Sequence, residues 1–435
     1  MLSLVGFLLV LAIIVLLLKG KMSPIVVLVL VPSLAALLIG TNIADLKEMI
    51  GAGMKTVSNN SILFIFSIIF FCIMSDVGVF DVIVDKLVAM AGENVIAITV
   101  ATGIIGIIAH LDGATATTVL ITIPTMYPIY KRMGIRPQVL LCLTACSMGV
   151  MNLLPWGGPV ARAATVLGVD ATGLWLKLIP IQIFGIVSTI TLAVILGTIE
   201  KKRGAGTTLK IDSSVVEKTK EELDPRFKKL LPLNIILTIA VIGLLMVDVL
   251  QSYYVFMIGL SLALCINYPS LKAQNEKIKE HAASALTISA TILSAGIMVG
   301  IMDGTGMIEA MAITLTNIIP SALGRFTHLI FGFLALPMGM LVGTDAYFFG
   351  LMPPIIEVGK AFGVEGINTA MAMLIGKNVS LMISPLVPAT YLALGLVEDL
   401  ELKDHIKFSF KYLYPVSVLM AVSYTHLRAH ETPEH

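Results

Sequence analysis

The stretch that decides the fold is VIAITVATGIIGIIAHLDGATATT, residues 95–118. Its first part, residues 95–109, is an uncharged apolar run of the kind that forms a helix inside a lipid bilayer. That run leads directly into His110 and Asp112. An ionisable side chain at membrane depth is costly, and is therefore a functional candidate by default. The stretch predicts a membrane protein whose chain turns at a polar site within the bilayer.

Apolar runs of similar length recur along the rest of the chain. The 435 residues are 57% hydrophobic and only 13% charged, with a mean hydropathy of +0.96. A soluble protein has too little interior to hold so much apolar surface. We therefore expect an all-α, multi-pass protein of the cell membrane (inner or plasma), with about 11–13 membrane segments. The net charge of +1 leaves no basic surface for nucleic acid.

One long charged segment, residues 199–231, divides the chain into two transmembrane halves, residues 1–198 and 232–422. Its nine Lys and Arg residues predict a cytoplasmic loop by the positive-inside rule. Residues 423–435 show no apolar period. We interpret them as a non-native tail that cuts the last helix short.

The two halves share a weak internal repeat. The segment IMSDVGVFD at 73–81 is similar to IMDGTGMIE at 301–309. Two further segments, about 110–130 and 343–358, are interrupted by polar residues, Gly and Pro, and are expected to be re-entrant hairpins. A matched pair of broken segments in two halves is the best sequence pointer to the binding site of a secondary transporter.

Polar side chains gather at the tip of the first hairpin. Asp112 is a candidate for binding a cation or a proton, or it simply caps the helix that follows. His110 and Asp112 would point about 200° apart on a helix, so they can share one ion only if the chain is unwound there. His110 is a candidate proton carrier or a partner for an orienting hydrogen bond. Thr117 and Thr118 offer hydroxyls to a ligand, or bond back to the preceding helical turn.

Each half also contains a segment that cannot stay helical. NLLPWGGPVARAA, residues 152–164, holds two prolines and two glycines close together, so its backbone must open and expose ligand groups. Arg162 just beyond can pair with a carboxylate, or anchor the chain at the cytoplasmic surface. GKNVSLMISPLVPAT, residues 376–390, is the counterpart in the second half, where Asp345 matches Asp112. The predicted substrate-binding residues are Asn152, Gly157, Gly158, Arg162, Thr117, Thr118, Asn378, Ser380, Ser384 and Thr390.

These features favour a secondary transporter for a small anion. The chain has no G-x-x-x-x-G-K-[ST] motif, so ATP-driven transport within it is not expected. An intramembrane aspartyl protease is an alternative that requires Asp112 and Asp345 to share a proton at close range. A channel is less favoured, because the chain has no repeated filter-like segment. We expect no catalytic residue and no permanently bound cofactor.

Four motifs together resemble those of one known family. They are HLDGATATT (110–118), GVMNLLPWGGPVARAATVLGVD (149–170), GTDAYFFGLMPPIIEVG (343–359) and MLIGKNVSLMISPLVPATYLALGL (373–396). They resemble the citrate–divalent metal/proton symporter family, a branch of the ion transporter superfamily. The resemblance implies two inverted repeats, each with a re-entrant hairpin and a broken helix, in a homodimer. It also implies import of citrate complexed with a divalent cation, such as Mg²⁺ or Ca²⁺, in symport with protons.

The electrostatics of such a cargo are favourable. Free citrate carries about three negative charges at neutral pH, and moving each one inward against 100 mV costs about 2.3 kcal/mol. Chelation of a divalent cation removes two of these charges, and co-transported protons cancel the remainder. On this interpretation Asp112 and Asp345 meet the metal or the proton, with His110 in proton coupling.

One departure from the family pattern leaves the cargo open. Several members carry a second acid and a glycine where this chain has Ala114 and Thr115. A different cation or another carboxylate is therefore an alternative. Na⁺/H⁺ antiport, which occurs in the same superfamily, is another.

Overall fold

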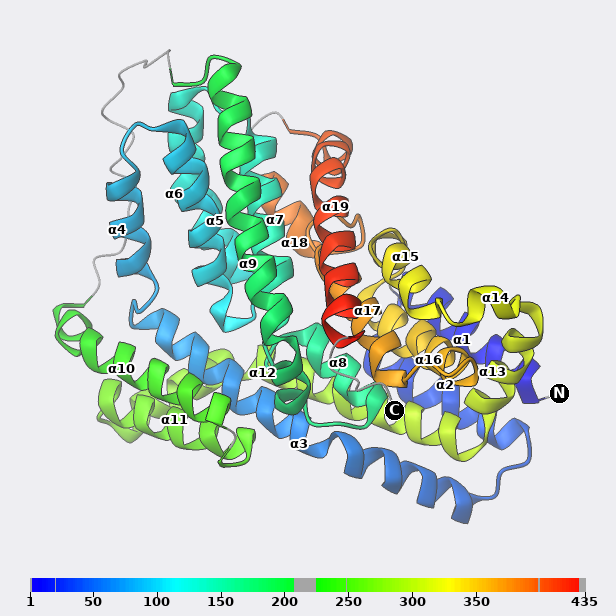
Figure 1. Cartoon of the computed structure of the whole chain (residues 1–435). Coiled ribbons are helices and arrows are strands. Elements are labelled where there is room, and N and C mark those ends of the chain that lie inside the picture. The colour runs from blue at the N-terminus through cyan, green and yellow to red at the C-terminus, as the bar shows by residue number, and fades with distance from the viewer. Residues whose placement is uncertain (1, 20, 207–223, 248, 398–399, 430–435) are drawn as a thin grey trace.

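A computed structural model of the chain describes residues 2–19, 21–206, 224–247, 249–397 and 400–429 (Figure 1). Within these ranges the chain is helical, with no strand. The prediction of an all-α protein is therefore confirmed.

The described helices divide at residues 207–223 into two sets. The first half contains α1 (Leu2–Leu18), α2 (Pro24–Leu38), α3 (Ile43–Asp76), α4 (Asp81–Ala91), α5 (Val95–Ala109), the 3-10 turn η1 (His110–Asp112), α6 (Thr115–Met133), α7 (Pro137–Met151), α8 (Gly158–Leu167) and α9 (Ala171–Lys202). The second half contains α10 (Pro225–Val247), α11 (Ser252–Asn267), α12 (Leu271–Gly304), α13 (Met307–Ile318), α14 (Ser321–Gly324), α15 (Thr327–Leu341), the π-helical turn η2 (Ala346–Leu351), α16 (Met352–Ala361), α17 (Gly366–Asn378), α18 (Pro388–Gly395) and α19 (Leu402–Ala429).

Several helices match a lipid environment. By length and composition, five described helices can cross a membrane, namely α3, α5 with η1, α9, α10 and α12. Large apolar side chains on the outer faces, such as Leu8, Ile183 and Ile239, are more than half exposed. Such exposed apolar faces are expected where a helix contacts lipid.

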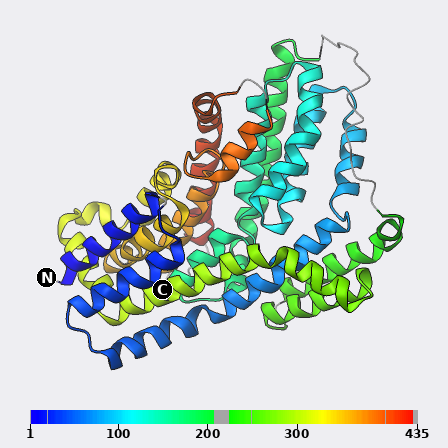
Figure 2. The ribbon, with the colours of Figure 1, turned by 180° about the vertical axis from the view of Figure 1, so that it is seen from behind.

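The longest helices, α3 and α12, have 34 residues each and cross in opposite directions (Figure 2). The end of α3 meets the start of α12, where the Lys277 ammonium lies 2.9 Å from the Asp76 carboxylate. Farther along, Ser289 donates a hydrogen bond of 3.1 Å to the carbonyl of Ser61. At the closest approach a Cβ atom on Gly53 would overlap the carbonyl of Gly296. Only glycine permits this crossing.

Four interruptions in the helices define the central region. The first tip, residues 110–114, joins α5 to α6, and the second tip, residues 342–345, joins α15 to η2 and α16. The first break, residues 152–157, separates α7 from α8, and the second break, residues 379–387, separates α17 from α18. The prediction that the Gly- and Pro-rich segments open the backbone is confirmed at both breaks.

Some predicted boundaries were wrong. The irregular segment expected over about 110–130 is confined to the first tip, since α6 runs on through Pro124 and Pro128. The second hairpin likewise continues as η2 and α16. Helix α19 extends to Ala429, so it is longer than expected and includes most of the stretch interpreted as a tail. Of the predicted charged loop, residues 207–223 lie outside the described residues.

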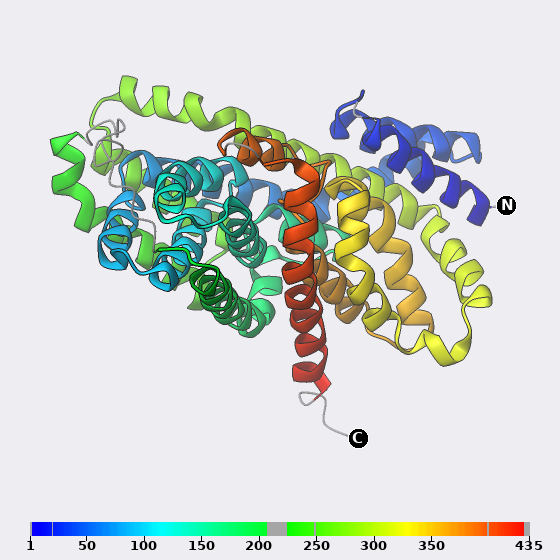
Figure 3. The same ribbon diagram turned by 90° about the horizontal axis from the view of Figure 1, so that it is seen from above.

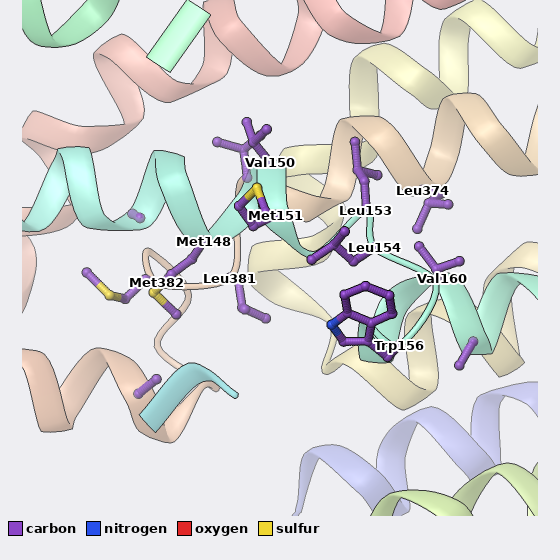
Figure 4. Close-up of a cluster of buried hydrophobic side chains, with 14 of the residues drawn as sticks. Met148, Val150, Met151, Leu153, Leu154, Trp156, Val160, Leu374, Leu381 and Met382 are labelled. Carbon is purple, nitrogen blue, oxygen red and sulfur yellow. The ribbon is translucent and has the colours of Figure 1, made fainter. Parts of the chain in front are cut away.

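Apolar packing holds the breaks in place (Figure 4). Leu153 and Trp156 of the first break are buried, as are Met382 and Ile383 of the second. The Trp156 ring stacks on Phe71 of α3 at a centroid distance of 4.7 Å. Helix α19 packs against α7 and α9 of the first half and against α15 and α17 of the second (Figure 3). The central region is therefore enclosed by both halves.

Candidate functional site

The first tip buries a histidine and an aspartate side by side in a tight turn. His110 and Asp112 are 0% and 2% exposed. Asp112 Oδ1 accepts the N–H of Ala114 at 2.8 Å, and Gly113, with φ of 71°, reverses the chain. The indole N–H of Trp156 donates to the Leu111 carbonyl at 2.7 Å and ties the tip to the first break. The turn is therefore fixed by the chain itself, without an ion.

Two ligand atoms at this tip remain unused. Asp112 Oδ2 and His110 Nε2 are buried without a hydrogen-bond partner among the described residues. Because a buried polar group without a partner is costly, such atoms point to a ligand or to water. The other ring nitrogen, His110 Nδ1, lies 2.6 Å from the Thr118 hydroxyl. That contact orients the ring.

The first break contributes an amide to the same place. Asn152 is 2% exposed, and its Nδ2 has no partner among the described residues. Its side chain lies beside His110, and the Thr117 hydroxyl lies beside Asp112. The structure thus brings together five of the predicted residues: His110, Asp112, Thr117, Thr118 and Asn152.

Helix α8 begins at the first break and connects the two halves. Gly157 lies tightly against the Asn152 carbonyl, where a Cβ atom would come within 2.5 Å. Arg162 lies one turn into α8, and its Nε is 2.6 Å from Asp345 Oδ1, 183 positions away. It also donates to the Gly158 carbonyl at 3.0 Å. Its side chain is only 14% exposed, so the interpretation of Arg162 as a surface anchor is wrong.

Hydroxyl groups bind the second break to the second hairpin. Ser384 donates to the Met340 carbonyl at 2.9 Å, and Thr390 donates to the Ser384 carbonyl at 2.9 Å. Ser380 donates to the Lys377 carbonyl at 2.7 Å. These three predicted ligand residues therefore have structural partners within the chain. Asn378 differs, because both polar atoms of its 1% exposed side chain lack a partner among the described residues.

Lys377 was not predicted as a site residue. This lysine is the penultimate residue of α17, is 1% exposed and donates to the Thr344 hydroxyl at 2.9 Å. The signal was present, since a lysine at the end of the apolar run 369–376 falls under the same intramembrane-charge rule that identified Asp112.

The last turns of α7 touch the start of the second break. A Cβ atom on Gly149 of α7 would lie 2.6 Å from Val379 Cα and 3.1 Å from the carbonyl of Asn378. The absence of a side chain on Gly149 therefore lets the ends of α7 and α17 meet. The two tips and two breaks form one central site with contributions from both halves.

Asp112 and Asp345 have separate partners in this site. Asp345 pairs with Arg162, whereas Asp112 caps its own turn. In the described part of the chain, no hydrogen bond joins the two carboxylates, as a proton-sharing protease pair would require.

The described residues contain one group of three possible metal ligands, Asp76, Glu280 and His281. Lys277 already pairs with both acids of this group.

The chain is similar to known proteins over nearly its whole length. A family model described as "Citrate transporter" matches residues 5–376. Two relatives from Bacillus subtilis (strain 168) are each 35% identical over 97% of this chain. One is named citrate transporter, aligned over 98% of its length, and the other Mg(2+)/citrate complex secondary transporter, aligned over 97%. The YdaH transporter of Alcanivorax borkumensis, described as having an unusual topology, shares the fold with a TM-score of 0.65 and 15% identity, over 90% of each chain.

These matches settle the class of protein. The family and the relatives are transporters and not enzymes, so the protease alternative is excluded. Together with the apolar helices, they make this a multi-pass protein of the cell membrane. Since the family model covers most of the chain and both relatives align over nearly all of it, the chain belongs to the citrate transporter family.

Proposed function

We propose that the protein is a secondary active transporter that imports citrate as a complex with a divalent cation, in symport with protons. The observation that carries this proposal is the central site itself. It combines unused acceptor and donor atoms on Asp112, His110, Asn152 and Asn378 with cationic side chains from both halves. A metal–citrate complex has both a cation and carboxylates to satisfy such a set.

The first tip is suited to the cation or the proton. Asp112 Oδ2 is an unused carboxylate oxygen, and the Thr117 hydroxyl beside it is a second hard oxygen. His110 Nε2 can take up a proton close by. Asp345 is less available, because Arg162 already holds one of its oxygens. We therefore assign Asp112 the main role in coupling and Asp345 a supporting one.

The carboxylates of citrate are expected on the other side of the site. The start of α8 at Gly158 presents the positive end of the helix dipole, while the N–H of Gly157 donates to the Leu154 carbonyl at 2.8 Å and holds the break open. Asn152 and Asn378 add unpartnered amide donors. The hydroxyls of Ser380, Ser384 and Thr390 shape this side by holding the second break. Arg162 acts through Asp345, which it keeps at the second tip.

Transport by purified protein tests the proposal. The protein is reconstituted in proteoliposomes with an inward proton gradient, and uptake of labelled citrate is measured without metal and with Mg²⁺, Ca²⁺ or Zn²⁺. We expect uptake that requires both one of these metals and the gradient. Uptake of citrate without metal would show that the transported species is free citrate and not a metal–citrate complex.

The same assay addresses the alternatives. Absence of citrate uptake under every condition would overturn the proposal, and labelled dicarboxylates and Na⁺-driven proton efflux would then be measured.

The carrier is further proposed to be a homodimer. Its mass in detergent, measured by light scattering, checks this.

A further inference from the structure

Lys377 is a buried residue of the second half, and the site as proposed above counts its charge but assigns it no ligand. Its Nζ donates to Thr344 Oγ1 at 2.9 Å and lies 5.4 Å from the centroid of the Phe348 ring. An ammonium group carries three donors. One neutral hydroxyl and one aromatic face therefore leave much of its charge without a partner.

No described carboxylate forms an ion pair with this lysine. Asp345, next to Thr344, is a carboxylate whose charge acts on Lys377, but Arg162 Nε lies 2.6 Å from its Oδ1. Arg162 and Asp345 are the charged groups that act on Lys377. Two cations thus share one carboxylate, and this side of the site has a surplus of one positive charge when both are protonated.

The surroundings admit the lysine stem and leave the neighbouring amide without a partner. A Cβ atom on Gly339 of α15 would lie 2.6 Å from Lys377 Cγ, so this glycine admits the lysine stem. The next residue, Asn378, keeps both side-chain polar atoms without a partner in the described structure. The first half has Met151 before its matching Asn152. The charge is therefore not a requirement of the helix end and belongs to the second half alone.

We propose that Lys377 receives a free carboxylate of the cargo, and that the cargo is therefore an anion that keeps at least one carboxylate outside the metal. This inference rests on the proposed function for the existence of such a cargo. The ammonium and the Asn378 amide donate to the same carboxylate, and the anion neutralises the surplus charge. Arg162 remains paired with Asp345 and positions the second tip.

Two neutral substitutions test this assignment. Lys377→Met copies the residue of the first half, and Lys377→Gln keeps a polar side chain of similar length. Because each removes a buried, unpaired ammonium, the variants are expected to be at least as thermostable as the wild type without ligand. Their apparent Kd for citrate with Mg²⁺, measured by titration calorimetry, is expected to rise at least about tenfold. Citrate uptake is expected to fall in parallel.

A matched control separates this effect from the loss of any lysine. Lys360→Met removes a lysine of the same half that is 52% exposed and paired with Glu357. It is expected to leave both Kd and uptake unchanged. A tenfold weaker Kd together with an unchanged or higher melting temperature is a combination that a purely structural lysine would not produce.

The outcomes separate this inference from the proposed function. If the wild type transports citrate and both neutral variants bind citrate as tightly as the wild type does, Lys377 does not bind the carboxylate of the cargo. The proposed function then stands. If neither variant folds, the lysine is structural and the inference fails. If the wild type transports no citrate, stabilisation by succinate, malate or phosphate is measured instead. The inference is supported if one of these anions stabilises the wild type and fails to stabilise the Lys377→Met variant. It is overturned if none of the anions stabilises the wild type.

Discussion

Asp112 uses its two carboxylate oxygens differently. Oδ1 accepts the Ala114 N–H and holds the turn, while Oδ2 is buried without a partner in the described structure. A capping residue needs only one acceptor. Asp112 therefore closes its own turn and does not cap α6, whose N-cap Ala114 has no side-chain cap, and it leaves a second oxygen for a ligand.

Asp112→Asn should separate these two roles. Asparagine keeps an oxygen for the turn and removes the charge, so we expect a folded protein. Metal-dependent citrate uptake is expected to fall at least about tenfold, because a contact to a charged group contributes about 1.5–3 kcal/mol. The measurement is proteoliposome uptake, with Asp303→Asn, an exposed acid near the end of α12, as the control. Unchanged pH and metal dependence in Asp112→Asn would contradict a coupling role.

The Arg162–Asp345 pair predicts a specific energetic coupling. Each side chain is less than one-fifth exposed, so loss of either partner leaves a poorly solvated charge. We expect Arg162→Gln and Asp345→Asn each to lower the melting temperature, and the double variant to recover part of the loss. A double-mutant cycle on unfolding should give a coupling of about 1–3 kcal/mol. Strict additivity would show that the pair is not formed in the membrane.

Single residues differed in how far the sequence could place them. Asp112 was identifiable because it interrupts an apolar run and is followed by a glycine. Lys377 follows an apolar run and was identifiable by the same rule, but its contact with Gly339 could not be predicted because the two residues are distant in sequence. The pairing of Arg162 with Asp345 was equally hidden, since the partners lie in different halves. Local patterns show which residues are polar but not which of them meet.

At the scale of the elements, the prolines in the two breaks and the prolines inside α6 had different effects. Pro155 and Pro385 lie in breaks, where Gly, Asn or Ser residues also disfavour a helix. Pro124 and Pro128 lie inside α6, which continues through them. A membrane helix tolerates proline where neighbouring groups satisfy the freed carbonyls. The sequence therefore predicted the breaks but overestimated the irregularity of the first hairpin.

The crossing of α3 and α12 gives a matched pair of substitutions on one helix. Gly53 is pressed against Gly296 and Gly300, whereas a Cβ atom on Gly51 would meet nothing within 4 Å. We expect Gly53→Ala to destabilise the protein by about 1–3 kcal/mol through overpacking. Gly51→Ala should be neutral or stabilise it by about 0.5–1 kcal/mol. Melting temperatures in detergent check both. Equal effects would mean that the helices do not approach this closely.

At the scale of the whole molecule, the two halves pair in an ordered way. Ser61 and Ser289 are hydrogen-bonded and 228 positions apart, and the starts of α3 and α12 differ by the same number. Matching residues of antiparallel helices meet in this way when a two-fold axis passes between them. The sequence hinted at the repeat through its matched motifs. It could not show the pairing, because α3 and α12 meet through glycines that form no motif by themselves.

An inverted repeat predicts opposite sidedness for matched positions. Asp170 precedes α9 and Glu401 precedes α19, and both are exposed. In a Cys265→Ser background, we expect a membrane-impermeant maleimide to label Asp170→Cys from outside intact cells. Glu401→Cys should react only after the cells are opened. Labelling of both from the same side would contradict the inverted arrangement, and labelling of Asp170→Cys only after the cells are opened would contradict the cytoplasmic placement of residues 199–231.

The contact between Gly149 and Val379 has a consequence for the efficiency of the carrier. Because the end of α7 touches the second break, displacement of one by a bound ion would alter the space available to the other. Coupling between binding sites is reciprocal, so on the proposed mechanism the cation and the anion would each change the affinity for the other through this point. A larger residue at position 149 would hold the end of α7 and the second break apart and loosen that linkage. On the proposed mechanism, such a variant would let protons enter without citrate and would dissipate the proton gradient.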